Sequence, residues 1–147
     1  MKTHPTDTLF TAITGGFLST VAYLIGGIDN LSNALAIFMI MDYGTGLASA
    51  YYIGKIDSHK AYKGLAKKSG MIAFVIVSNQ LDIITGNTGG FLRDAMIMFL
   101  IGMEGISIKE NVQKMGFDAP GFIVDALNKL IGKKNDPTDP PDKTKGA

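Results

Sequence analysis

The chain has 147 residues, which is enough for one modest domain but not for two independent hydrophobic cores. Its 14 Lys and Arg residues nearly balance 13 Asp and Glu residues, so the net charge gives no reason to expect a nucleic-acid partner. Only 18% of the residues are charged, below the roughly 25% of a typical soluble domain. Without Cys, the chain cannot form disulfides or thiolate metal sites, and its two His are too few for a histidine metal site without carboxylate ligands. We expect no enzyme activity, no metal and no cofactor.

No residue from Thr8 to Ile28 carries a formal charge. A mainly apolar run of ~20 residues is long enough for a helix to cross the hydrocarbon core of a bilayer. A cleaved signal peptide is the alternative, but no small-x-small cleavage site comes before Gly26. The run therefore predicts a retained transmembrane helix over residues 8–28.

Three further stretches are mainly apolar, and each contains an acidic residue. An Asp at a helix centre costs about 3 kcal/mol on an insertion scale, against roughly −0.3 to −0.6 kcal/mol for each strong apolar residue. The apolar residues around Asp42 therefore offset most of its cost. Polar groups inside a span are expensive and tend to mark functional positions. The sequence predicts spans over 34–53, 68–84 and 91–108, with candidate functional residues Asp42, Thr45, Asp82 and Glu104.

A soluble helical bundle is the competing interpretation of these acidic residues. Such a bundle needs polar faces at helical spacing, but residues 95–103 contain no polar side chain. The predicted fold class is therefore an all-α integral membrane protein. It has about four transmembrane helices in antiparallel hairpins, a C-terminal amphipathic helix and a disordered tail.

The basic residues are distributed asymmetrically along the chain. With four spans, every Lys falls on one side of the membrane and Arg93 falls on the other. The positive-inside rule makes the lysine side cytoplasmic, so both termini are expected in the cytoplasm. The loop between spans two and three is expected to carry a basic cluster: Lys55, Lys60, Lys63, Lys67 and Lys68.

The C-terminal region changes character after the fourth span. Asp118 is expected to cap an amphipathic helix over about 119–131, and Gly132 to end it. The apolar stripe of this helix suits the membrane interface, an oligomer contact or packing under the bundle. From residue 133 to 147 nothing is available to bury, so a disordered charged tail follows a single membrane domain over 1–132. The stripe consists of Phe122, Ile123, Ala126, Leu127, Leu130 and Ile131.

Small residues recur four positions apart in the first two spans, a spacing that lets two helix backbones approach closely in lipid. Such faces serve either the fold of one chain or contact between copies, the former being the commoner use. They are formed by Gly15 with Ser19, Gly16 with Thr20, Gly44 with Ala48, and Gly46 with Ala50.

The sequence resembles a known family over about residues 35–130. M-D-Y-G-T-G-L at 41–47, a short basic segment, and K-G-L-A-K-K at 63–68 are similar to the core signature of the phage lysis/toxin-secretion holins. E-G-I-S-I-K-E-N at 104–111 resembles the family's later segment, which includes Ser107, Glu110 and Asn111. Met103 departs from the pattern, because a polar Asn is frequent there.

The resemblance implies a multi-pass protein of the bacterial (host) inner membrane. Such a protein accumulates, forms a homo-oligomer in the lipid bilayer and opens lesions through which an endolysin or toxin leaves during cytolysis. A small ion channel or transporter subunit is an alternative, with Asp42 and Glu104 lining its pathway. A non-conducting membrane partner such as an antiholin is another.

The depths of the predicted spans also suggest an ion pair. Antiparallel packing of spans three and four would bring Glu104 to the level of Lys67 and Lys68. Hydration of Glu104 near the cytoplasmic headgroups is the alternative.

Overall fold

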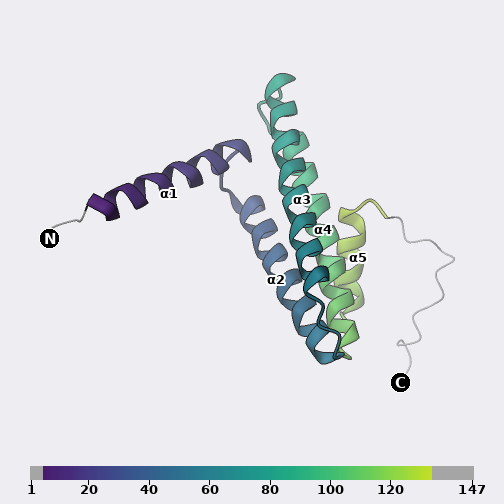
Figure 1. Ribbon diagram of the computed structural model, residues 1–147. Coiled ribbons are helices and arrows are strands. Elements are labelled where there is room, and N and C mark those ends of the chain that lie inside the picture. Colours follow the sequence, from purple (N-terminus) through teal and green to yellow (C-terminus); the bar gives the residue numbers. More distant parts are fainter. Residues whose placement is uncertain (1–4, 134–147) are drawn as a thin grey trace. The chain divides into compact units, whose positions relative to one another are not determined.

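The computed structural model describes residues 5–133, without the side chains of residues 5–7, 60 and 61. All secondary-structure elements of the described residues are α-helices, as predicted, and short connections join them (Figure 1). The helices are α1 (Pro5–Leu24), α2 (Asn30–Tyr52), α3 (Ser58–Ile84), α4 (Phe91–Lys114) and α5 (Gly121–Leu130). Apart from residue 133, the tail predicted to be disordered over residues 133–147 lies outside the described residues.

The helices belong to two compact units. The first unit comprises Met1–Ile37 and Asp57–Met98, and the second comprises Phe38–Ile56 and Phe99–Ala147, in so far as these ranges are described. The first unit thus contains α1, α3 and the first turns of α2 and α4. The second contains the rest of α2 and α4 together with α5.

Among the described residues, α2 is the helix that is long and apolar enough to cross a membrane, by length and composition alone. Thr8–Leu24 in α1 is a shorter apolar helix. The structure therefore confirms that the predicted segments are helical, and the crossing of a membrane by four of them stays a prediction. Charged residues within the helices explain the difference, since lysines occupy the first turns of α3, and the apolar stretch of α4 contains Arg93, Asp94 and Glu104.

α1 ends four residues before the predicted limit at residue 28. Gly26 and Gly27 have φ of 82° and 105°, a left-handed conformation that L side chains rarely adopt. The N–H of Gly27 donates to the carbonyl of Ala22 (2.8 Å), which closes the last turn. α2 then begins earlier than predicted, because Asp29 and Ser32 cap it reciprocally. Asp29 N–H donates to Ser32 Oγ (2.8 Å), and Ser32 N–H donates to Asp29 Oδ1 (2.9 Å).

The prediction that the basic cluster lies in a loop is wrong for most of its residues. α3 begins at Ser58, ten residues before the predicted span, so Lys60, Lys63, Lys67 and Lys68 are helical and only Lys55 stays in the connection. Asp57 Oδ1 accepts a hydrogen bond from the N–H of His59 (2.9 Å) at the start of this helix. Lysine is a good helix former in spite of its charge. The start of the apolar run therefore does not mark the start of α3.

α5 differs from its prediction at its first turn. Its N-cap is Pro120, which makes no side-chain capping bond. The carboxylate of Asp118 instead accepts a hydrogen bond from Gln113 Nε2 (3.2 Å), so the prediction that Asp118 caps the helix is wrong. The predicted stop is confirmed, because Gly132, which follows the C-cap residue Ile131, has φ of 69°.

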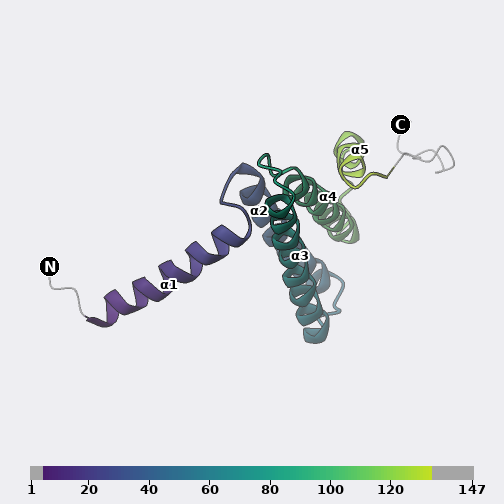
Figure 2. The same ribbon diagram turned by 90° about the horizontal axis from the view of Figure 1, so that it is seen from above.

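Two buried glycines of α4 allow α5 to lie close against it (Figures 1 and 2). A Cβ atom on Gly105 would overlap the Leu127 side chain, and one on Gly102 would lie 2.9 Å from Leu130 Cβ and 3.2 Å from the Leu127 carbonyl oxygen. Leu127 itself is buried. Of the predicted α5 stripe, only Leu127 is buried and Ile131 is half-buried, while Phe122, Ile123, Ala126 and Leu130 remain exposed.

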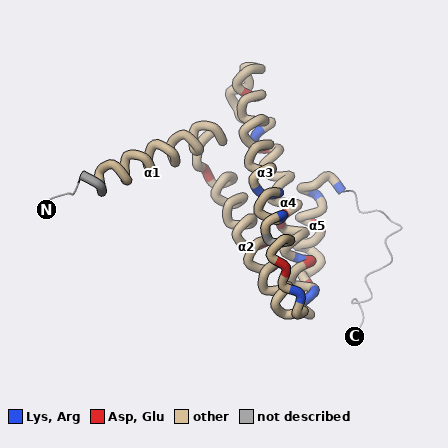
Figure 3. Tube along the Cα trace, viewed as in Figure 1, with Lys and Arg blue, Asp and Glu red and all other residues tan. Residues whose placement is uncertain are grey.

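The described chain leaves much of its apolar surface uncovered. α1 carries no charge from Thr8 onward (Figure 3), and its large apolar side chains, such as Phe10 and Phe17, are exposed. Apart from the adjoining backbone of its own helix and its chain neighbours, no described atom lies within 4 Å of a Cβ placed on Gly15, Gly16 or Gly44. These three glycines therefore adjoin no other helix within the described residues, whereas Gly46 faces Asn111 of α4.

We expect Gly102→Val to loosen α5 from α4. The added atoms would meet the backbone carbonyl of Leu127, which has less room to move than a side-chain end, and overpacking of this kind costs ~1–3 kcal/mol. Limited proteolysis of α5 and thermal unfolding in detergent measure the effect.

Gly44→Ala is the control for this substitution, because a Cβ at Gly44 meets no described atom and Ala favours helix. Equal proteolysis of the two variants would contradict the proposed packing of α5.

Candidate functional site

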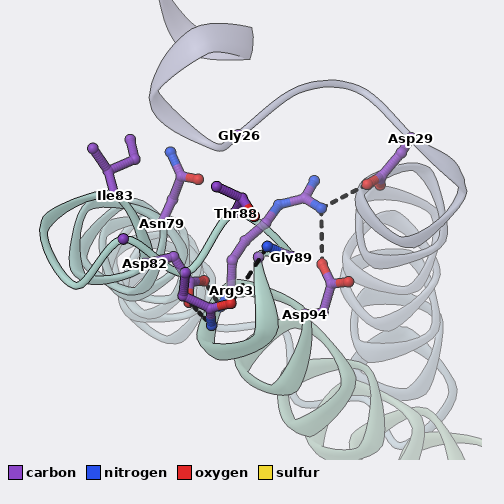
Figure 4. Close-up of a pocket in the computed structure, with 12 residues that line it drawn as sticks. Gly26, Asp29, Asn79, Asp82, Ile83, Thr88, Gly89, Arg93 and Asp94 are labelled. Atoms are coloured by element: carbon purple, nitrogen blue, oxygen red, sulfur yellow. Dashed lines mark hydrogen bonds and ion pairs between the residues drawn. The ribbon is translucent and has the colours of Figure 1, made fainter.

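The buried Arg93 side chain, near the start of α4, is the centre of a polar cluster in the first unit (Figure 4). Nη1 donates to Asp29 Oδ2 (2.6 Å) and to Asp94 Oδ1 (2.9 Å). Nε donates to the carbonyl of Ile25 (2.8 Å), and Nη2 donates to the carbonyl of Gly27 (3.1 Å). A buried charge is tolerated when it is paired and hydrogen-bonded. We call Asp29, Asn79, Asp82, Arg93 and Asp94 the Arg93 junction.

Asp82 caps α4 from the preceding helix. The residue before α4 is Gly90, which has φ of 65° and no side chain to satisfy the free N–H groups of the first turn. The Asp82 carboxylate accepts from the N–H groups of Leu92 (3.1 Å) and Arg93 (2.8 Å), and from Asn87 Nδ2 (2.7 Å). Asp82 is 2% exposed, and its carboxylate takes the place of an N-cap side chain for the buried first turn of α4.

The same cluster reaches the end of α1. Asn79 Nδ2 donates to the carbonyl of Leu24 (3.0 Å), the last residue of the helix. A Cβ at Gly26 would lie 2.5 Å from Asn79 Oδ1, and the φ of +82° at this position would be strained for any other residue. Both the close contact and the backbone conformation therefore favour glycine. The connection between α1 and α2 is therefore fitted closely to α3 and α4.

A cavity of about 490 Å³ lies beside these contacts (Figure 4). Its walls are partly polar and partly apolar, and they come from the α1–α2 and α3–α4 connections and the adjoining helix ends. The described residues contain no group of three or more His, Cys, Asp or Glu side chains able to hold a metal. The cavity is lined by Gly26, Asp29, Asn79, Asp82, Ile83, Gly86, Asn87, Thr88, Gly89, Gly90, Arg93 and Asp94.

The Arg93 junction shifts the ionisation of Asp29. The hydrogen bond from the Arg93 guanidinium holds the pKa of the Asp29 carboxyl well below its usual range, and bonds from Ser32 act in the same direction. Asp29 therefore stays ionised through neutral and mildly acidic pH.

The second unit contains a smaller polar cluster. Asn111 Nδ2, from α4, donates to Asp42 Oδ1 (3.0 Å) and lies 3.4 Å from Thr45 Oγ1, both on α2. Gly46 leaves room for this amide, since a Cβ there would lie 3.4 Å from Asn111 Nδ2. The structure thus brings together Asp42 and Thr45, predicted as intramembrane polar residues, and Asn111 of the later motif.

The other predicted residues are distributed more widely. Glu104 is 2% exposed on α4, Ser107 is half-buried and Glu110 is exposed. Glu104 belongs to the second unit, whereas Lys67 and Lys68 belong to the first, so their pairing stays a prediction from the sequence.

Arg93, Asp29 and Asn79 were not predicted as site residues from the sequence. One available signal was that Arg93 is the single basic residue on the far side of the predicted membrane. The other was the pattern D-x-x-S at 29–32, which is a capping pattern at the start of a helix.

We expect Asp29→Asn to lower stability by a pH-independent amount above about pH 5. A carboxyl whose pKa is depressed by folding stabilises the fold above the unfolded pKa of ~3.9 and loses this contribution as pH falls through the folded pKa. Since the Asp29 side chain is 48% exposed, we expect an effect of ~1 kcal/mol or less.

Thermal unfolding of both proteins in detergent between pH 8 and pH 3 tests this expectation. The difference between them should shrink only below about pH 4. A difference that disappears between pH 7 and pH 5 would contradict the ion pair.

Residues 19–132 match the model of the bacteriophage holin family. An uncharacterized protein of Listeria innocua is 35% identical over 128 residues, which cover 87% of this chain and 91% of that protein. An uncharacterized protein of Bacillus subtilis is 32% identical over 124 residues, 84% of this chain and 87% of its own. No solved structure matches the chain.

One relative carries a functional name. The probable holin of Bacillus phage phi105 is 31% identical over 125 residues, which cover 85% of this chain and 91% of the phage protein. The family match spans both polar clusters and all of α2 to α5. The chain therefore belongs to the bacteriophage holin family.

Proposed function

We propose that this protein is a holin that accumulates in the bacterial cytoplasmic membrane, oligomerises there and opens lesions. Through these lesions an endolysin or a toxin leaves the cytoplasm. The observation that carries the proposal is the family match over residues 19–132, together with the similarity to a probable phage holin. The chain itself is proposed to have no enzyme activity.

The uncovered apolar surface supports a membrane location. α2 has 23 residues, about 34 Å at 1.5 Å per residue, against a hydrocarbon core of ~30 Å. Ile40, Met41 and Leu47 are exposed on this helix, and Phe10 and Phe17 on α1. A monomer in water rarely tolerates exposed apolar surface of this extent, whereas lipid covers it without cost.

We propose four spans, carried by α1 to α4, with both termini in the cytoplasm. The lysines in the first turns of α3 agree with this orientation, because a Lys stem can extend along apolar surface while its ammonium group stays among the headgroups. Arg93 would then lie on the outer side, where its pairing with Asp29 and Asp94 limits the cost of its position.

Reporter fusions test this topology. We expect a fusion after Asn87 and a fusion after Lys134 to report opposite sides of the membrane, because α4 would separate them. A phosphatase fusion, active outside, and a fluorescent-protein fusion, active inside, provide matched readouts. Signals on the same side would remove the fourth span from the proposal.

Induction in bacteria, with and without a cytoplasmic endolysin, tests the holin function. We expect a delayed and abrupt arrest of growth in both cultures, and lysis only in the culture that contains the endolysin. Ion-selective currents without escape of the folded enzyme would contradict lesion formation and favour a channel. Continued growth at high membrane levels would contradict it too and favour a partner such as an antiholin.

We expect Asp42→Leu to shift the time of triggering and Asp42→Asn to shift it less. Leu removes the side-chain carboxylate that is the nearest acceptor of Asn111 Nδ2, whereas the amide oxygen of Asn keeps an acceptor in the same place. Lysis curves at matched membrane levels measure the shift. Wild-type timing in both variants would contradict a role for the cluster of Asp42, Thr45 and Asn111.

A further inference from the structure

The end of α1 depends on hydrogen bonds from other helices. The last carbonyls of a helix have no partner within it. The chain itself supplies donors to Val21, Ala22 and Tyr23, from the N–H groups of Ile25, Gly27 and Gly26. The carbonyls of Leu24 and Ile25 receive theirs from Asn79 of α3 and Arg93 of α4.

Apolar burial does little to hold α1. Its described residues from Thr8 to Thr20 are all exposed, and only its last turn is half-buried. Arg93 is 5% and Asn79 8% exposed, so the polar contacts at the helix end are shielded from water. Shielded and fully satisfied polar networks are rigid.

We propose that Arg93, assisted by Asn79, is the positioning residue of α1: it completes the C-terminal cap of this helix from outside and thereby fixes its direction relative to α3 and the start of α4. Beyond the cap, Gly26 and Gly27 provide a flexible connection when these bonds are absent. α1 then presents its exposed surface, including Gly15 and Gly16, in one direction.

The chemistry of the contacts requires arginine at this position. The guanidinium directs donors from three nitrogens to Ile25, Gly27, Asp29 and Asp94 at once. Lysine has a single nitrogen with three donors and reaches fewer of these acceptors. Arg93→Lys should therefore restore part of what Arg93→Met loses.

Spin labels can measure the direction of α1. The chain has no Cys, so two introduced cysteines are the only sites of labelling. One pair joins Ile13 of α1 to Ile84 of α3, and the control pair joins Ile84 to Phe91 across the α3–α4 turn. All three residues are exposed.

Double electron–electron resonance on the full chain in lipid vesicles then gives two distance distributions. In the parent protein, we expect one narrow peak for each pair. Arg93→Met should remove the narrow peak of the Ile13–Ile84 pair and leave the Ile84–Phe91 pair unchanged, because Asp82 still binds the backbone N–H of residue 93. Arg93→Lys should give an intermediate width. Lys114→Met, an exposed cation on the same helix, should match the parent.

The consequence for triggering rests on the proposed holin function. If assembly uses α1 in a fixed direction, Arg93→Met should delay lysis at an equal membrane level, and Arg93→Lys should delay it less. A parent protein that never triggers would refute the holin function while leaving the distance measurement intact.

Three results would overturn the inference. A narrow Ile13–Ile84 peak in Arg93→Met would show that α1 is held by other contacts. Broadening of the Ile84–Phe91 control would assign Arg93 to folding of the turn. Parent-like or earlier lysis in Arg93→Met, with α1 released, would refute its role in assembly.

Discussion

A buried guanidinium that must be paired is the constraint on which the first unit depends. Arg93 cannot lose its charge, and burial without partners would cost several kcal/mol. Its partners are two carboxylates and two backbone carbonyls, contributed by the connection before α2 and by α4 itself. The connection must therefore follow a path that brings these groups together, and Gly26 and Gly27 allow it to do so.

The two units use different means to bring helices together. In the first unit, charged and amide side chains join helix ends, with Asp82 capping α4 and Asn79 reaching α1. In the second, glycines bring α5 close to α4, where Gly102 and Gly105 receive the Leu127 and Leu130 side chains. Both means leave large apolar side chains of α1 and α2 exposed in the described part of the chain, in agreement with the proposed membrane location.

The sequence predicted the helical class, the approximate location of each helix and the stop at Gly132, because apolar runs and glycines are local signals. The predicted length of α3 was too short, because lysines interrupt an apolar run without interrupting a helix. The capping role was assigned to Asp118, whose carboxylate instead accepts from Gln113. Such competition between donors for one carboxylate is decided by geometry, which a single sequence does not contain.

The polar clusters were only partly predictable. Asp42 and Asp82 were visible as acidic residues in apolar runs, and Asn111 as part of a motif. The partners of Arg93 were not, because two of its acceptors are backbone carbonyls, which every residue carries. Likewise, the first turn of α4 is capped by Asp82, which lies eight positions before Gly90. Local capping patterns do not extend over such a separation.

Amide hydrogen exchange in the first turn of α4 tests most directly the claim that the polar contacts organise this end of the first unit. The N–H groups of a first helical turn normally lack partners and exchange quickly. Because Asp82 accepts from Leu92 and Arg93, the amides of these two residues should exchange slowly in the parent protein. They should exchange as fast as an uncapped turn in Asp82→Ala. Fast exchange in the parent, or slow exchange that survives Asp82→Ala, would contradict the claim.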